Sequence, residues 1–283
     1  MGGRIGHPQI QKTQIKKSVY LCHMNTLNYT NVLKQKETIL FVVLAGIFIT
    51  NAIIAEFIGI KVFALEETLG LEKMNWKLFG NQGSLMLSAG VLIWPVVFIM
   101  TDIVNEYFGK RGVKMLSYLT AALIAFGFLI IFMSIHLAPA GFWVTDFKER
   151  GVEDMQVAYS AVYGQGLYII VGSLVAFLVG QVVDAFVFQR IKRSTGEQNI
   201  WLRATGSTVI SQLLDSYLVL YIAFVIGNDW SIDLFLAVGT VNFCYKVFMA
   251  VLMLPLLYLV HGLIDSYLGK EIASAMKAEA MVG

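Results

Sequence analysis

Charged residues are scarce in this chain. Only 14% of its 283 residues are Asp, Glu, Lys or Arg, whereas 57% are hydrophobic. Soluble domains average roughly 25% charged residues. The apolar residues gather in long stretches, and about 20 such residues in a row suffice to cross the hydrocarbon of a bilayer. The composition therefore argues against an ordinary soluble domain and predicts a membrane protein.

Cysteines and enzyme motifs are scarce as well. The two cysteines, Cys22 and Cys244, provide no disulfide framework. The sequence has no Walker A loop, no HExxH and no Gly-x-Ser-x-Gly, and its four histidines are widely scattered. A net charge of +2 does not suggest nucleic-acid binding. We therefore expect no metal, no cofactor, no direct nucleic-acid partner and no ATP-driven transport by this chain alone.

Six apolar stretches predict an all-α, polytopic membrane protein with six transmembrane helices. Their approximate bounds are 38–63, 84–108, 112–136, 165–188, 205–226 and 234–260. Fifteen Lys and Arg residues lie in the two termini and in the second and fourth connections, against four in the other three connections. Because positive charge concentrates on the cytoplasmic side, both termini are predicted to be cytoplasmic, which agrees with an even number of crossings.

The predicted organisation is one membrane domain with two tails. Residues 1–37 form a basic cytoplasmic tail that lacks the features of a secretory signal, with Met1 or Met24 as its start. Residues 38–270 form the six-helix transport domain, and residues 271–283 form a C-terminal tail. The longest connection, 137–164, could form a short interfacial segment or a lid, but a plain connector is the favoured interpretation.

A weak internal repeat relates two segments of the chain. Pro95–Lys110 and Pro255–Lys270 share Pro, Tyr, Gly and Lys at matching positions, with Asn105 opposite Asp265. Transporters are often built from repeats. A chance similarity between two apolar helices is the equally weighted alternative.

Lys246 is the most informative residue, because it lies near the middle of the last apolar stretch. A lone lysine at that depth costs about 3 kcal/mol on insertion scales, so it requires a partner or a polar cavity. Asp215, near the middle of the preceding stretch, is a candidate partner. Asp184, Asp102 and Glu56 lie in three other stretches.

Polar residues recur within the stretches at spacings of three or four, which places them on one helix face. The sets are Asp102, Asn105 and Glu106; Gln181 and Asp184; Thr208, Ser211, Gln212 and Asp215; Asn242 and Lys246; and, more loosely, Asn51 and Glu56. Lipid cannot solvate these groups, so they are predicted to face a shared interior. Bonding between helices is favoured for Thr208 and Ser211, and a binding role for Asp215 and Lys246. Glu106 could equally be solvated at its helix end.

Four segments in order resemble the queuosine precursor transporter family, also called the vitamin uptake transporter family. They are Thr101–Gly109, Gly180–Phe188, Ser207–Asp215 and Phe243–Lys246, the last followed by Pro255. The resemblance covers about residues 38–270. It implies a multi-pass importer in the bacterial cytoplasmic (inner) membrane that takes up 7-deazaguanine bases, namely 7-cyano-7-deazaguanine and its aminomethyl successor, for queuosine synthesis in transfer RNA.

The predicted binding site combines charged and amide side chains from several stretches. Its core is Asp215, Lys246, Gln181 and Asp184, with Asp102, Asn51 and Gln212 next. Carboxylates can accept the N–H donors of a guanine-like edge, and an amide or ammonium can donate to its carbonyl. Asp215 and Lys246 are expected to pair in the empty site and to exchange partners with the substrate. The prediction is thus a non-enzymatic importer of a small purine-like molecule that works by alternating access within the lipid bilayer, with a homo-oligomer left open.

Two other functions stay open on the sequence alone. The chain could be the substrate-binding subunit of an ATP-driven vitamin-type uptake system, which transport by the chain alone would exclude. It could also be an intramembrane enzyme that uses Asp102 or Asp184 as acid or base, although it lacks a recognisable nucleophile or paired-aspartate motif. Coupling to protons is likewise open, since buried carboxylates permit it.

Overall fold

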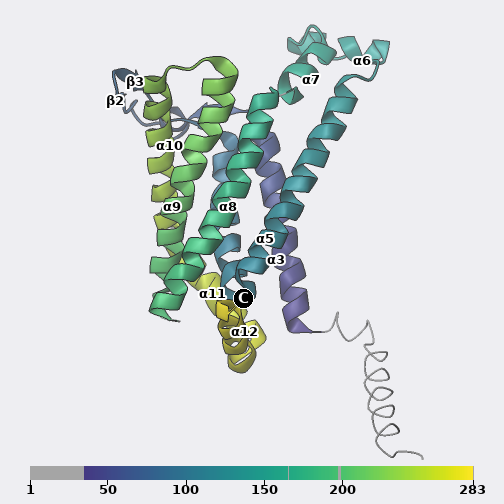
Figure 1. Ribbon diagram of the computed structural model, residues 1–283. Coiled ribbons are helices and arrows are strands. Elements are labelled where there is room, and N and C mark those ends of the chain that lie inside the picture. Colours follow the sequence, from purple (N-terminus) through teal and green to yellow (C-terminus); the bar gives the residue numbers. More distant parts are fainter. Residues whose placement is uncertain (1–34, 165, 197–198, 283) are drawn as a thin grey trace, which may run out of the picture. The chain divides into compact units, whose positions relative to one another are not determined.

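The computed structural model describes residues 35–164, 166–196 and 199–282 (Figure 1). The chain divides into two units after Val43, and each is described by itself. Helix α3 (Lys36–Ile58) begins in the first unit, and every later element belongs to the second. The predicted N-terminal tail, 1–37, lies almost wholly outside the described residues, and so do both proposed start positions.

Five helical stretches in the described part of the chain are long and apolar enough to cross a membrane. They are α3, α5 (Trp94–Ile135), the run from α7 (Met155–Tyr163) through α8 (Leu167–Thr195), the run from α9 (Ile200–Leu220) through the π-helical η3 (Tyr221–Ile226), and α10 (Ile232–Leu252). A shorter apolar helix, α11 (Leu254–Leu268), follows. These helices confirm an all-α polytopic membrane protein. Six crossings and cytoplasmic termini stay predictions.

Helix α5 reverses direction at Gly109, whose φ of 67° and ψ of −175° are not helical. The first arm runs along α8, because Trp94 packs against Phe177 and Glu106 pairs with Lys192. The second arm returns and meets α7, where the side chain of Gln156 donates to the carbonyl oxygen of Ile135 (Figure 1). The predicted stretches 84–108 and 112–136 therefore correspond to the two arms of one broken helix.

The segment before α5 folds into two short hairpins, so the predicted helix over 84–108 is wrong in its first ten residues. Strand β1 (Val62–Ala64) pairs antiparallel with β4 (Met86–Ser88), and β2 (Trp76–Leu78) pairs with β3 (Asn81–Gly83). Between them lies the helical turn α4 (Leu65–Thr68), and the 3-10 helix η1 (Ala89–Leu92) leads into α5. Pro95 then suits the first turn of α5, where its missing N–H is not needed.

Glu66 joins these hairpins. Its carboxylate is buried and accepts hydrogen bonds from the backbone amides of Leu85, at 2.7 Å, and Met74, at 3.4 Å. Burial alone would raise the pKa of Glu66, but these backbone hydrogen bonds hold it below its ordinary value. The segment is thus ordered by a charged group that hydropathy alone does not reveal.

Two segments that the sequence predicts as a connector and as a tail contain helices. The connection 137–164, predicted as a plain connector, contains α6 (Gly141–Thr145), the 3-10 helix η2 (Lys148–Arg150) and α7. The predicted C-terminal tail, 271–283, is helix α12 (Lys270–Val282), which packs on α5. The predicted last stretch, 234–260, is divided between α10 and α11 at Met253, because Pro255 favours a helix start there.

Helices α8 and α9 lie side by side (Figure 1) and pack more extensively than any other pair of elements in the described part of the chain. Glycines allow the close approach. A Cβ at Gly172 would lie 3.1 Å from the carbonyl oxygen of Val219, and one at Gly180 would lie 3.6 Å from the Cβ of Asp215. Small residues at helix contacts are typical of membrane proteins. This packing brings Asp215 of α9 against the polar face of α8.

Gly109→Ala should lower the free energy of unfolding by about 1–2 kcal/mol, because a residue with a side chain is strained at positive φ. Its Cβ would also lie only 3.0 Å from the carbonyl oxygen of Ala280 in α12. Gly46→Ala is the matched control, since nothing lies within 4 Å of the added Cβ, and should leave stability equal or slightly higher. Thermal unfolding of both variants in detergent checks this. Equal melting temperatures for Gly109→Ala and the unaltered protein would contradict it.

Candidate binding site

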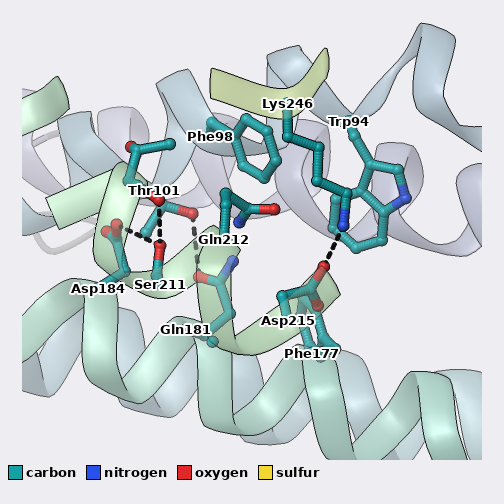
Figure 2. Close-up of a pocket in the computed structure, with 12 residues that line it drawn as sticks. Trp94, Phe98, Thr101, Phe177, Gln181, Asp184, Ser211, Gln212, Asp215 and Lys246 are labelled. Carbon is teal, nitrogen blue, oxygen red and sulfur yellow. Dashed lines mark hydrogen bonds and ion pairs between the residues drawn. The ribbon is translucent and has the colours of Figure 1, made fainter. Parts of the chain in front are cut away.

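A pocket lies among α5, α8, α9 and α10, and Figure 2 shows the side chains that line it. It contains about 410 Å³ of space free of atoms, part of which is open to the surroundings. Most of this space is narrow, and it has room for only about one or two water molecules. The pocket is therefore narrow in this conformation, and a larger ligand would require side chains or helices to move.

An ion pair occupies one end of the pocket. The ammonium of Lys246, from α10, donates to the carboxylate of Asp215, from α9. Their side chains keep 17% and 22% of their exposure. Each charge inside the helices needs a counter-charge, so the pairing explains how Lys246 is tolerated in an apolar helix. The residual exposure leaves both groups accessible from the pocket.

Hydroxyl and amide groups occupy the rest of the pocket (Figure 2). Ser211 donates to Asp184 Oδ1 at 3.1 Å, and the hydroxyl of Thr101 lies 3.0 Å from Gln181 Oε1. Two buried acceptor atoms of the residues that line this pocket, Asp184 Oδ2 and Gln212 Oε1, have no hydrogen-bond partner in the described structure. Buried polar atoms are nearly always bonded, so these two are the best placed to receive N–H donors from a ligand.

An aromatic wall lines another side of the pocket. Trp94 and Phe98 have ring centroids 6.2 Å apart with planes inclined by 24°, and Phe177 lies 6.0 Å from Trp94. Flat apolar surfaces with a few polar groups are typical of small-molecule sites. The position of Trp94 in an apolar stretch does not by itself show which side of the helix the ring faces, so the sequence alone does not reveal this wall.

The structure brings together most of the predicted site residues. Five line the pocket: Asp215, Lys246, Gln181, Asp184 and Gln212. Asp102 lies outside it and lines an adjoining pocket that shares Phe98 and Thr208. Asn51 does not line the pocket either, because its amide donates to the carbonyl oxygen of Ile47 within α3 at 2.8 Å. Glu56 of the same helix instead receives a hydrogen bond from Ser173 of α8. A binding role for these residues stays a prediction.

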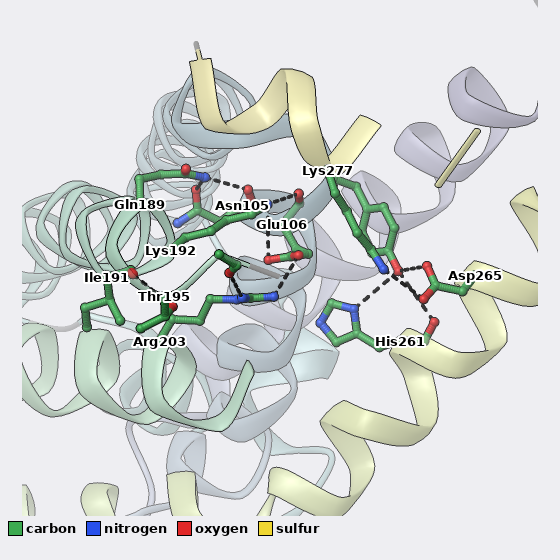
Figure 3. Close-up of polar contacts among 12 residues, drawn as sticks. Asn105, Glu106, Gln189, Ile191, Lys192, Thr195, Arg203, His261, Asp265 and Lys277 are labelled. Atoms are coloured by element: carbon green, nitrogen blue, oxygen red, sulfur yellow. Dashed lines mark hydrogen bonds and ion pairs between the residues drawn. The ribbon is translucent and has the colours of Figure 1, made fainter. Parts of the chain in front are cut away.

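A second charged cluster lies farther along α8 (Figure 3). Glu106 Oε1 pairs with Arg203 at 2.8 Å and Oε2 with Lys192 at 3.3 Å, and all three residues are fully buried. Beside them, Gln189 donates to Asn105 Oδ1 at 2.8 Å. The prediction that Lys192 and Arg203 are charges of the fourth connection is wrong, because α8 and α9 extend beyond the apolar stretches. The alternative of a solvated Glu106 is also wrong, because Glu106 is buried between these two cations. Gln189 and Lys192 are three positions apart and so share a face of α8, a signal that was available in the sequence.

Further polar contacts join the C-terminal helices α11 and α12 to the end of the first arm of α5, just before Gly109. Tyr107 donates to Asp265 Oδ1 at 2.6 Å, and Lys277 of α12 donates to Asp265 Oδ2 at 2.8 Å (Figure 3). His261 lies beside Tyr107, with its Nδ1 3.3 Å from the hydroxyl. Helix α12 is therefore attached to α11 by the Lys277–Asp265 ion pair and to α5 by packing.

Glu106→Gln should lower the free energy of unfolding by about 3–5 kcal/mol, because two buried cations would lose the carboxylate between them. Glu271→Gln, at an exposed position in the first turn of α12, is the control and should change stability by less than about 0.5 kcal/mol. Denaturant or thermal unfolding of the purified variants measures both. A Glu106→Gln protein as stable as the control would show that the cluster contributes little to stability.

The described helices define a polytopic membrane protein with a polar pocket between its helices. Residues 88–260 match the family described as "Putative vitamin uptake transporter", which is more than half of the chain. The chain belongs to this family, as its four segments predicted. The matched range contains every pocket residue from Trp94 to Lys246, whereas Asn51 lies outside it.

Curated relatives are similar at lower identity. A Bacillus subtilis (strain 168) protein named "Probable queuosine precursor transporter" is 26% identical over 183 residues, covering 64% of this chain and 73% of the relative. The Escherichia coli (strain K12) protein named "Queuosine precursor transporter" is 24% identical over 193 residues, covering 68% and 79%. No solved structure matches the chain.

Proposed function

We propose that this protein imports queuosine precursors, 7-cyano-7-deazaguanine and its aminomethyl successor, across the bacterial cytoplasmic membrane. The observation that carries the proposal is the pocket that joins the Asp215–Lys246 pair, two amides and an aromatic wall between membrane helices. The family and the names of two relatives support the substrate class.

The pocket chemistry suits a planar guanine-like base. Such a base presents several N–H donors and a carbonyl acceptor on its edge, and apolar faces above and below. Asp184 Oδ2 and Gln212 Oε1 are acceptors without partners, and Lys246 is a donor able to reach a carbonyl. Trp94 and Phe177 provide the surface against which the ring stacks.

Substrate binding exchanges partners at the ion pair. When the substrate carbonyl accepts from Lys246, an N–H of the base takes its place at Asp215, so neither charge is left without a partner. Because the pocket has room for only one or two water molecules, entry of a base must be accompanied by a wider conformation. Opening first to one side and then to the other is alternating access, with no chemical change to the substrate.

Asp215→Asn and Lys246→Met should each slow uptake at least tenfold, because replacing one member of this partly buried pair leaves the other charge without its partner and removes a group that the substrate contacts. Proteoliposomes containing only this chain, with labelled 7-cyano-7-deazaguanine, provide the measurement. Asp233→Asn and Lys270→Met, both at exposed positions, are matched controls and should transport normally.

Three outcomes of this experiment would count against the proposal. Normal uptake by both pocket variants would exclude the assigned site. Uptake that occurs only with a separate ATPase would favour a substrate-binding subunit, and a chemically altered base would favour an enzyme. In cells, the same variants should fail to restore queuosine in a strain that lacks both precursor synthesis and its importer.

Trp94→Ala should raise the dissociation constant of the base roughly tenfold, since stacking on an aromatic side chain contributes about 1–3 kcal/mol per base. Trp94→Phe should retain most of the affinity, because a flat ring remains. Trp201→Ala, which removes a tryptophan 48% exposed at the start of α9, is the control. Calorimetric titration of the purified proteins checks the order. Unchanged affinity in Trp94→Ala would show that the base does not stack on this aromatic wall.

A further inference from the structure

One carboxylate oxygen of Asp102 has no hydrogen-bond partner in the described part of the protein. Asp102 is only 5% exposed, and its Oδ1 accepts no hydrogen bond. The neighbouring buried acids differ, since Glu106 pairs with Lys192 and Arg203, and Asp184 receives a hydrogen bond from Ser211. A buried polar group without a partner requires an explanation.

Asp102 stands between the pocket and the Glu106 cluster. It follows Thr101, which contacts Gln181 of the pocket, and it precedes Glu106 by one helical turn. The second pocket, which Asp102 lines, shares Phe98 and Thr208 with the first. It contains about 300 Å³ of space free of atoms. Like the first pocket, it has room for about one or two water molecules, here beside Asp102 and next to the binding site.

The surroundings of Asp102 are mostly apolar or acidic. Its charged neighbours are Asp184 of α8, Glu106 of its own helix and Arg203 of α9, the last already paired with Glu106. Thr205 of α9 also lines the second pocket, whereas α10 and α11 contribute apolar side chains such as Ala250 and Leu257. No counter-charge is thus dedicated to Asp102 in the described structure.

A proton is the ligand that this site fits. An isolated ionised carboxylate costs several kcal/mol when it is removed from water, and two nearby acids add repulsion. Neutralisation by a metal ion would need several oxygen ligands, but the described residues contain no cluster of three or more acidic, His or Cys side chains able to hold one. A single proton on the carboxyl removes the cost without further ligands.

We propose that Asp102 is a proton-binding site that couples import to the proton gradient and does not itself contact the substrate. The inference rests on the proposed function. A proton from water in the outward-open pocket binds Asp102, travels with the conformational change, and leaves to water on the predicted cytoplasmic side. No bond of the substrate forms or breaks. The sequence placed Asp102 among the substrate-binding residues. In this proposal it binds a proton next to those residues instead.

Gradient-driven transport in proteoliposomes tests the coupling. With an alkaline interior, the unaltered protein should accumulate labelled 7-cyano-7-deazaguanine, up to about tenfold for one pH unit and one proton per substrate. Asp102→Asn should still exchange labelled for unlabelled base without a gradient, but should accumulate none when the gradient is applied. Asp233→Asn, at an exposed acid on α10, is the matched control and should do both. Accumulation by Asp102→Asn equal to the unaltered protein would overturn the proposal. So would accumulation driven by a sodium gradient instead of the pH gradient.

Infrared spectroscopy provides a readout that requires no substrate. A carbonyl band from a protonated carboxyl group should be present at neutral pH and lost in Asp102→Asn, but kept in Asp233→Asn. If the unaltered protein exchanges no base at all, the proposed function fails while this band still decides whether Asp102 binds a proton. A spectrum unchanged by Asp102→Asn would overturn the proton site even in an active importer.

Discussion

A polar side chain inside a bilayer needs a partner within the protein or a polar cavity to face, and helix α8 shows how this chain provides most of those partners. One face of α8 carries a polar or small residue every three or four positions. The contacts along it are Ser173 with Glu56, Gly180 with Asp215, Gln181 with Thr101, Asp184 with Ser211, Gln189 with Asn105, and Lys192 with Glu106. This single stripe positions both the pocket and the charged cluster around Glu106, because its partners come from α3, α5 and α9.

The two ion-paired groups along this stripe differ in their access to the pocket. Glu106, Lys192 and Arg203 are fully buried, so separating them would leave charges without water or partner, at a cost of several kcal/mol. Asp215 and Lys246 keep part of their exposure and border free space. A ligand can therefore replace one partner of this pair directly. The same kind of interaction thus holds the helices together at one level and is suited to exchange at another.

Helical spacing made much of the pocket predictable, since positions three and four apart must share a face. It predicted that Gln181 shares a helix face with Asp184, and Gln212 with Asp215. The cost of a buried lysine predicted a partner for Lys246. Hydropathy did not distinguish strand from helix in the short apolar run at 84–93. Hydropathy also predicted an end for α8 that is too early. Lys192 and Arg203 resemble charged loop residues in the sequence, and only the structure shows that both pair with Glu106. Asn51 shows that a polar residue can satisfy itself within its own helix.

The internal repeat gains support from backbone geometry. Pro95 and Pro255 both lie in the first turn of a helix, and 160 positions of sequence separate them as they separate Gly109 from Gly269. Both glycines end a 15-residue helical arm at positive φ, 67° and 87°. Chance similarity between apolar helices accounts for shared leucines and valines, but not for the same left-handed break after the same number of residues. Tyr107 and Asp265, near these two breaks, then bond to each other, so the repeated ends of the two helices form one contact.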